Sequence, residues 1–265
     1  MSRPIFLLTD FGLSDPFVGI MKAVVLRLSP GSPLVDLTHG IPPQDVVAGA
    51  MALEDSVPWL PGDAVVCAVV DPGVGSERRA IAFERGGQTF VGPDNGLLAA
   101  AWSSGARAVA LRAGTEIAPG RSATFHGRDV FAPAAALLAA GADLMALGDA
   151  MEGIAPLAVP APEPLPDGSL ALAVLAIDHF GNLTLNLRQT DLARYFPGAT
   201  GLHLRAGERV LLGLSRTFGD VEQGEPLFYW NAAGRLEVAV NGGDASRELG
   251  LARGDGVVLC PAGRS

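Results

Sequence analysis

The stretch AVVCAVVDPGVG (residues 64–75) decides how this chain is expected to fold. Its first seven residues form a continuous apolar run, which is typical of a strand buried on both faces of a sheet. A turn rich in glycine and proline follows at once and begins with Asp71. Open α/β sheets bind ligands at the ends of such strands. The stretch therefore predicts a central strand and, directly after it, a candidate site.

Strands and helices alternate around this stretch in the first part of the chain. Apolar runs predict strands at 5–9, 34–38 and 108–112 and a hairpin of 80–85 with 89–91. Helix-like spacing predicts helices at 17–28, 44–57, 97–102 and 129–140, the last with Pro133 in its first turn. The alternation favours an α/β domain over residues 1–155 with a central, mostly parallel sheet.

The pattern changes after residue 155. Five prolines between 156 and 166 predict a semi-rigid linker, which we place at 156–168. Short strand-like segments separated by turn residues then follow, at 170–177, 183–187, 210–214, 226–230, 235–240 and 256–259. They predict a smaller all-β, barrel-like domain over residues 169–265.

Composition excludes several classes of protein. The chain has 28 acidic against 19 basic side chains and a net charge of −9, which argues against a nucleic-acid partner and is compatible with a small cationic ligand. Its two cysteines make neither a disulfide framework nor a zinc site. The N-terminal apolar run is too short for a signal peptide, and no stretch approaches the roughly 20 residues that span a bilayer. We expect a cytoplasmic protein without a membrane partner.

Common catalytic motifs are missing from the sequence. There is no phosphate-binding G-x-x-x-x-G-K-[ST], no G-x-G-x-x-G between strand and helix, and no G-x-S-x-G around a serine nucleophile. The four histidines show no H-x-x-x-H pair. A metal hydrolase or a covalent hydrolase therefore has little support, and no metal is expected.

Polar residues after the predicted strands are the remaining candidates. Asp10 follows the first strand, with Asp15 close behind, and its carboxylate can accept both hydroxyls of a ribose or else cap its own turn. Asp71 and Arg78 share a tight loop and can orient a water molecule, or they form a surface ion pair worth about 0–1 kcal/mol. His126, in the segment TFHGRD, is either a general base or a structural histidine.

The second domain has a similar strand end in IDHFGN (residues 177–182). Phe180 can stack on a purine and Asn182 can read its edge, as amide side chains do with adenine. Phe218 can supply the second face of such a stack. The alternative is that both phenylalanines belong to the core. Asn231 begins the segment NAAG, which is most simply a hairpin turn.

Five motifs along the chain, taken in order, resemble those of the S-adenosylmethionine hydroxide adenosyltransferases, which are hydrolase relatives of the fluorinases and chlorinases. They are TDFG (9–12), DPGVG (71–75), GPDNG (92–96), FHGRD (125–129) and FGN (180–182), and the resemblance extends from about residue 3 to residue 260. It implies an N-terminal α/β domain, a C-terminal β-barrel domain, and a homotrimer with active sites between subunits. It also implies displacement at the ribose 5′ carbon of S-adenosyl-L-methionine (SAM), which yields adenosine and methionine. SAM is then the substrate, and no cofactor is implied.

The resemblance also assigns roles to residues. Asp71, Arg78 and His126 fall on the catalytic triad associated with the attacking water. The chemistry of these side chains then suits a role for Arg78 in favouring a hydroxide-like nucleophile, for His126 in taking its proton and for Asp71 in orienting them. The substrate-binding set comprises Asp10 at the ribose diol, Phe180, Asn182 and Phe218 around the adenine, Asp178 near the methionine amino group, and Asp15, Asn95 and Asn231.

Four positions depart from the fluorinase pattern. Asp71 and Gly127 stand where fluorinases carry a tyrosine and a serine at the halide pocket, and Asp71 would repel a halide. Ala232 replaces a serine that helps to hold the methionine carboxylate, and Gln44 replaces a tryptophan. SAM hydrolysis is therefore favoured over two alternatives, a SAM-dependent halogenase and a non-catalytic adenosine or SAM sensor. The catalytic triad argues against the sensor, because binding adenosine alone would not need it.

Overall fold

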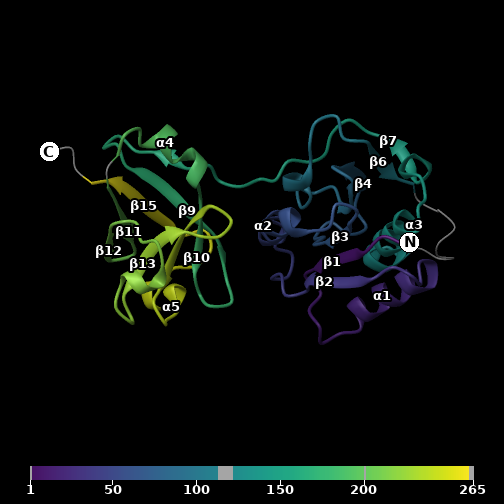
Figure 1. Ribbon diagram of the computed structural model, residues 1–265, viewed down its shortest axis with the longest axis horizontal. Coiled ribbons are helices and arrows are strands. Elements are labelled where there is room, and N and C mark those ends of the chain that lie inside the picture. The colour runs from purple at the N-terminus through teal and green to yellow at the C-terminus, as the bar shows by residue number, and fades with distance from the viewer. Residues whose placement is uncertain (1, 113–121, 200, 263–265) are drawn as a thin grey trace. The chain divides into compact units, whose positions relative to one another are not determined.

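The computed structural model describes residues 2–112, 122–199 and 201–262, and the chain divides into two compact units, Met1–Ala158 and Val159–Ser265 (Figure 1). The division falls inside the proline-rich segment at 156–168. Each unit has its own hydrophobic core, so each is described by itself.

The first unit is built on a sheet of seven strands within the described residues. In spatial order these are β2 (Leu34–Thr38), β1 (Ile5–Thr9), β3 (Val65–Val69), β5 (Gln88–Pro93), β4 (Ala80–Arg85), β6 (Ala108–Leu111) and β7 (Gly148–Ala150). The pairs β1–β2, β1–β3 and β3–β5 are parallel, and the other three pairs are antiparallel. The sheet is thus mixed rather than mostly parallel, because the tight β4–β5 hairpin reverses the chain and β6 and β7 continue the antiparallel pattern.

Helices cover both faces of this sheet (Figure 1). The side chains of Ile5 and Leu7 in β1 pack with α1 (Phe17–Leu28) and α3 (Ala132–Ala139). Their neighbours in β1 point to the other face, where the core includes residues of α2 (Val46–Ser56). This alternation explains the uninterrupted apolar runs of β1 and β3, since both faces are buried. Short 3₁₀ turns lie at Val57–Trp59, Ala99–Ala101 and Leu144–Ala146.

Two helices expected from the sequence differ from those in the structure: one begins earlier than expected, and the other is shorter. The helix expected at 129–140 begins as a π-helical segment at Gly127–Phe131, in which the amide of Ala132 donates to the carbonyl of Gly127, and continues as α3. Pro133 lies in the first turn of α3, where its missing N–H costs little. The helix expected at 97–102 is only the 3₁₀ turn at Ala99–Ala101.

The second unit is an antiparallel, barrel-like sheet, as expected. Its strands run in the order β12 (Arg209–Leu212), β11 (Leu202–Ala206), β15 (Gly256–Pro261), β9 (Leu170–Ile177), β10 (Leu183–Arg188), β14 (Arg235–Val240) and β13 (Pro226–Trp230), with β8 (Glu163–Pro164) beside β9. A bridge between Ser215, just after β12, and Tyr229 in β13 brings the two ends of the sheet together. The helices α4 (Leu192–Tyr195) and α5 (Ala245–Leu249) and the 3₁₀ turns Gln189–Asp191 and Phe218–Asp220 complete the unit.

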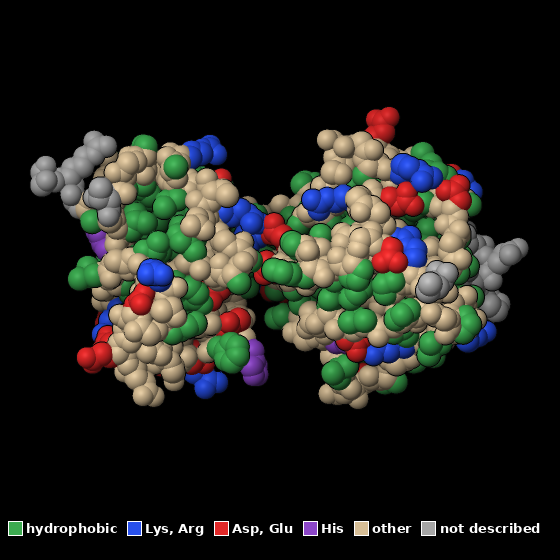
Figure 2. Space-filling model, in the orientation of Figure 1, with side chains coloured by type: hydrophobic (Ala, Val, Ile, Leu, Met, Phe, Trp, Pro, Cys, Tyr) green, Lys and Arg blue, Asp and Glu red, His purple; other side chains and the backbone are tan. Residues whose placement is uncertain are grey.

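Charged side chains of both signs lie on the surface. On the face drawn in Figure 2, basic and acidic side chains are interspersed over both units rather than gathered by sign.

Of the helices in the described part of the chain, none is long and apolar enough to cross a membrane. Cys67 is completely buried in β3, and this burial raises the pKa of its thiol to about 12, as befits an unreactive core thiol.

Candidate active site

The three predicted catalytic residues form one contact cluster at the carboxyl end of β3. Nε of Arg78 donates to Oδ1 of Asp71 at 2.8 Å, and Nη2 donates to Oδ2 of the same carboxylate. Nη2 also lies 2.7 Å from Nδ1 of His126. The side chains of Arg78 and Asp71 are only 9% and 5% exposed, so this is a buried, bidentate ion pair rather than a solvated one.

The contact with Arg78 fixes how His126 carries its proton. A guanidinium group has donors and no acceptor, so Nδ1 of His126 must be the acceptor in this contact. A neutral ring then carries its proton on Nε2. While Arg78 holds Nδ1, the ring takes no second proton at that nitrogen. On its other side, Arg78 stacks over the ring of Phe131, 5.2 Å from its centre.

Gly75 lets the loop that carries Asp71 and Arg78 lie against the loop that leads to His126. Its φ is +80°, and a Cβ at this position would lie 2.7 Å from the carbonyl oxygen of Ala123. Any residue with a Cβ at position 75 would force the two loops apart.

We therefore expect Gly75→Ala to destabilise the protein by about 2–4 kcal/mol and to lower turnover, because it separates His126 from Arg78. Gly105→Ala is the matched control, since Gly105 has a φ of +82° and a Cβ there would meet nothing within 4 Å. It should cost about 1 kcal/mol and leave turnover unchanged. Urea unfolding and steady-state rates measure both. Equal losses in the two variants would show that the loop contact is unimportant.

A cavity of about 480 Å³ opens beside this cluster. Its walls include Asp71, His126 and three aromatic rings, those of Phe11, Phe17 and Phe125, which pack edge to face. The volume lies in the range of small-molecule sites. Arg78, which contacts both Asp71 and His126, is not among the residues that line the cavity.

Asp10 follows β1, the parallel neighbour of β3, so both strands end at the same edge of the sheet. Its Oδ2 accepts the backbone N–H of Gln44 at 2.7 Å, and the described residues offer no hydrogen bond to Oδ1. Asp10 therefore does not cap its own turn. Gln44 adopts a φ of 66°, the single positive value at a non-glycine position in the described ranges. Such a conformation costs about 1 kcal/mol or more and is often found at functional sites.

Asp15 and Asn95 have different surroundings. Asp15 is exposed in the loop before α1, and no described residue gives it a hydrogen bond or an ion pair. The side chain of Asn95 donates to the carbonyl of Val70 at 2.9 Å and accepts the N–H of Leu97 at 3.1 Å. Asn95 thus fixes the backbone immediately before Asp71.

In the second unit, Asp178 organises the turn that follows β9. One of its oxygens accepts the N–H groups of Phe180 and Asn182 at 2.9 and 2.8 Å, and the other accepts the side-chain amide of Asn182 at 2.9 Å. Gly181, with a φ of +87°, is required here because a Cβ would overlap the carboxylate of Asp244. The ring of Phe180 is 73% exposed, so it is not a core aromatic.

A buried carboxylate, Glu237, links the other two predicted residues of this unit. It accepts hydrogen bonds from the phenol of Tyr229 and from the side-chain amide of Asn231, the latter at 2.8 Å. The ring of Phe218, 40% exposed, packs 5.2 Å from that of Tyr229. Burial and Glu237 raise the pKa of the Tyr229 phenol far above its ordinary value. The sequence analysis missed Glu237. The signal that could have identified it is an acidic residue inside the otherwise apolar stretch of the strand RLEVAV (235–240).

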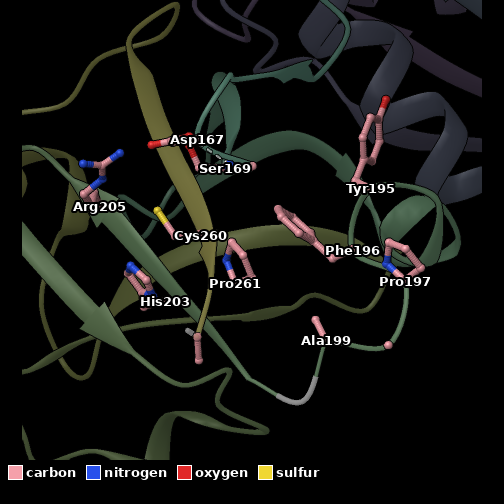
Figure 3. A pocket seen from close by; sticks show the side chains of 13 residues that line it. Asp167, Ser169, Tyr195, Phe196, Pro197, Ala199, His203, Arg205, Cys260 and Pro261 are labelled. Carbon is pink, nitrogen blue, oxygen red and sulfur yellow. Dashed lines mark hydrogen bonds between the residues drawn. The ribbon is translucent and has the colours of Figure 1, made fainter. Parts of the chain in front are cut away.

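A larger hollow, of about 1120 Å³, lies in the second unit beside β11 and β15 (Figure 3). It contains none of the predicted residues. Its acidic side chain, Asp167, accepts hydrogen bonds from the hydroxyl and the backbone of Ser169, which lower the pKa of this carboxyl. Asp167 is thus occupied within its own turn. Groups of three or more residues suited to holding a metal ion are absent from the described part of the chain.

Comparison with known proteins decides the family. Residues 5–148 match the SAM hydroxide adenosyltransferase N-terminal domain, and residues 172–258 match the corresponding C-terminal domain. The chain belongs to this family.

Relatives in the SAM hydroxide adenosyltransferase family cover nearly the whole chain. An (R)-S-adenosyl-L-methionine hydrolase of Thermus thermophilus is 46% identical over 264 residues, which is 95% of this chain and 97% of the relative. A fluorinase of an Actinoplanes species is 29% identical over 96% of each chain. The crystal structure of an uncharacterized conserved protein from Thermotoga maritima superposes with a TM-score of 0.85 at 34% identity and covers 97% of this chain and 99% of its own.

Proposed function

We propose that this protein hydrolyses (R)-S-adenosyl-L-methionine to adenosine and L-methionine by attack of water or hydroxide on the ribose 5′ carbon. The buried Asp71–Arg78–His126 cluster, on the wall of a cavity of small-molecule size, carries the proposal. The name of the Thermus relative adds the (R) configuration, which the motifs alone do not specify.

The chemistry suits these residues. A sulfonium substrate already carries a neutral thioether leaving group, so the weak partner is water, which gives up a proton only reluctantly. The buried guanidinium of Arg78 stabilises negative charge that develops on the attacking oxygen. Attack by an anion on a cation cancels charge, so a cavity partly walled by aromatic rings, which is less polar than water, favours the reaction. Alignment of the oxygen with the breaking C–S bond supplies much of the remaining acceleration.

The geometry suggests a division of roles that differs from the expected one. Asp71 lines the cavity and orients the attacking water, while Arg78 supplies positive charge next to it. His126 holds Nη2 of Arg78 through Nδ1, which makes it a poor proton acceptor in this arrangement. We propose that His126 keeps Arg78 in place, and that the proton of the attacking water leaves to solvent.

The remaining assignments are also proposals. The open Oδ1 of Asp10 suits a ribose hydroxyl, and the exposed rings of Phe180 and Phe218 suit an adenine. The carboxylate of Asp178 is occupied by its own turn, which leaves the methionine end with less support. A homotrimer with active sites between subunits and a cytoplasmic location stay predictions.

Halide transfer is the second candidate function, and Gly127 argues against it. A Cβ at this position would lie 3.1 Å from both Sδ of Met21 and the ring of Phe11, and 3.2 Å from the ring of Phe125. The serine that fluorinases carry here would therefore need its neighbours to move. The carboxylate of Asp71 also accepts a hydrogen bond from the O–H of a water, and a halide has no such donor.

The direct test is turnover in water enriched in heavy oxygen. We expect the (R) diastereomer of SAM to give adenosine that carries the heavy isotope in its 5′-hydroxyl, detected by chromatography and mass spectrometry, and to react faster than the (S) diastereomer. Formation of chloro-adenosine on addition of chloride would contradict hydrolysis. Unreacted SAM together with tightly bound adenosine would instead indicate the sensor.

A further inference from the structure

A series of contacting side chains begins at Thr9, next to Asp10, where it is buried, and reaches the surface at Asp36 and Lys22. Thr9 is fully buried at the end of β1, and its Oγ1 lies 2.8 Å from Nδ1 of His39. The His39 ring is buried too, and its Nε2 lies 3.0 Å from Oδ1 of Asp36. Lys22 of α1 ends the series by donating to Oδ2 of Asp36 at 2.6 Å. The catalytic cluster does not use any of these groups.

One arrangement of protons satisfies this series. The carboxylate of Asp36 accepts only, so it favours a proton on Nε2 of His39, 3.0 Å away, although this contact is not aligned well enough to count as a hydrogen bond. Nδ1 is then an acceptor, and the Thr9 hydroxyl donates to it. Burial raises the pKa of Asp36, but the hydrogen bond from Lys22 and the proximity of His39 outweigh it and lower the pKa, so the carboxyl stays ionised.

These contacts fix the backbone on the C-terminal side of Asp10. The N–H of Phe11 donates to Oγ1 of Thr9 at 3.2 Å, and the N–H of Gly12 donates to the carbonyl of His39 at 2.8 Å. The amide of Gln44 then holds Oδ2 of Asp10 at 2.7 Å. One carboxylate oxygen is thus anchored, and the turn that presents the other is tied to buried groups.

We propose that Thr9 and His39 are positioning residues for Asp10, which hold its carboxylate in the orientation that binds the vicinal diol of a ribose. The inference rests on the proposed function, in which Asp10 binds that diol. Thr9 and His39 act through the turn at residues 9–12 and do not touch the ligand. A carboxylate that is ordered before the ligand arrives loses less freedom on binding, and this increases affinity for the diol alone.

The test compares the binding of adenosine and of 2′,3′-dideoxyadenosine, which lacks the diol, to the full chain. The ratio of the Kd of dideoxyadenosine to the Kd of adenosine measures what the diol contributes to affinity. By calorimetry, the wild type should bind adenosine at least about tenfold more tightly. Thr9→Val removes the hydroxyl at nearly constant shape, and we expect it to lower the ratio about fivefold or more while the Kd of dideoxyadenosine stays the same. Thr9→Ser keeps the hydroxyl and should keep the ratio within about twofold.

Equal weakening of both ligands by Thr9→Val, or an unchanged ratio, would overturn the inference. If Thr9→Val fails to fold, His39→Asn and His39→Leu give the same comparison, since asparagine restores an acceptor for Thr9 and leucine does not. Asp10→Asn separates this inference from the proposed function. A ratio near one in the wild type, or a ratio that Asp10→Asn leaves unchanged, would refute the role of Asp10 itself. A ratio that only Asp10→Asn lowers would refute the roles of Thr9 and His39 alone.

Discussion

Asp71→Ala is expected to lower kcat/KM for SAM by about 10²–10⁴-fold, while the Kd of adenosine changes by less than about threefold. The carboxylate lines the cavity and orients both the water and Arg78, but in the proposed function it does not bind the nucleoside. Rates come from product analysis, and affinity comes from calorimetry. A variant that keeps the full rate would refute the role of Asp71.

The same substitution should also destabilise the fold, by about 3–5 kcal/mol in urea unfolding, because Arg78 loses its partner while it stays buried. The double variant Asp71→Ala with Arg78→Met is the control. It removes both charges, so it should recover much of the stability and none of the turnover. If the double variant regained activity, the loss in Asp71→Ala would reflect misfolding rather than chemistry.

His126→Ala is expected to lower kcat by about 10²-fold or more with adenosine binding retained, and His126→Asn is expected to recover a large part of the rate. The reason is that an asparagine oxygen can accept the hydrogen bond from Nη2 of Arg78 that Nδ1 accepts in the wild type. Alanine leaves that donor without this acceptor. Single-turnover rates on both variants measure the difference.

A proton-accepting His126 would give the opposite result. Asparagine cannot take a proton, so His126→Asn would then be as slow as His126→Ala. The wild type would also lose rate below the ordinary histidine pKa of about 6.5, and the asparagine variant would lack that dependence. Either observation would restore the role expected from the sequence.

Local pattern was enough to predict several elements whose side chains follow a simple periodicity or a continuous apolar run. The helix expected at 17–28 matches α1 and the strand expected at 5–9 matches β1, because periodicity and a continuous apolar run reflect burial directly. The strand expected at 34–38 also matches β2, although this edge strand is only partly buried. The strand β11 (Leu202–Ala206) was missed because His203 and Arg205 alternate with its buried residues, which resembles a polar loop. The π-helical start before α3 has no signature of its own in the sequence.

At the site, the order of the motifs was enough to group Asp71, Arg78 and His126. What the sequence could not provide was orientation. The tautomer of His126 depends on a contact across 48 residues, and the anchor of Asp10 depends on a backbone amide 34 residues away. Glu237 and His39 were missed for the same reason, since each gains its meaning only from side chains that the fold brings around it.

The buried ion pair of Asp71 and Arg78 also bears on how new activities can arise on this scaffold. The resemblance to the fluorinases implies a tyrosine at the position of Asp71, but that replacement alone would leave a buried guanidinium without its counter-charge. The cost of about 3–5 kcal/mol is a large fraction of the 5–15 kcal/mol that keeps a typical protein folded. Positions 71 and 78 are therefore expected to change together, and Gly127 adds a third constraint through its crowded neighbours. An evolutionary route from water to halide as nucleophile would need linked substitutions rather than one permissive step.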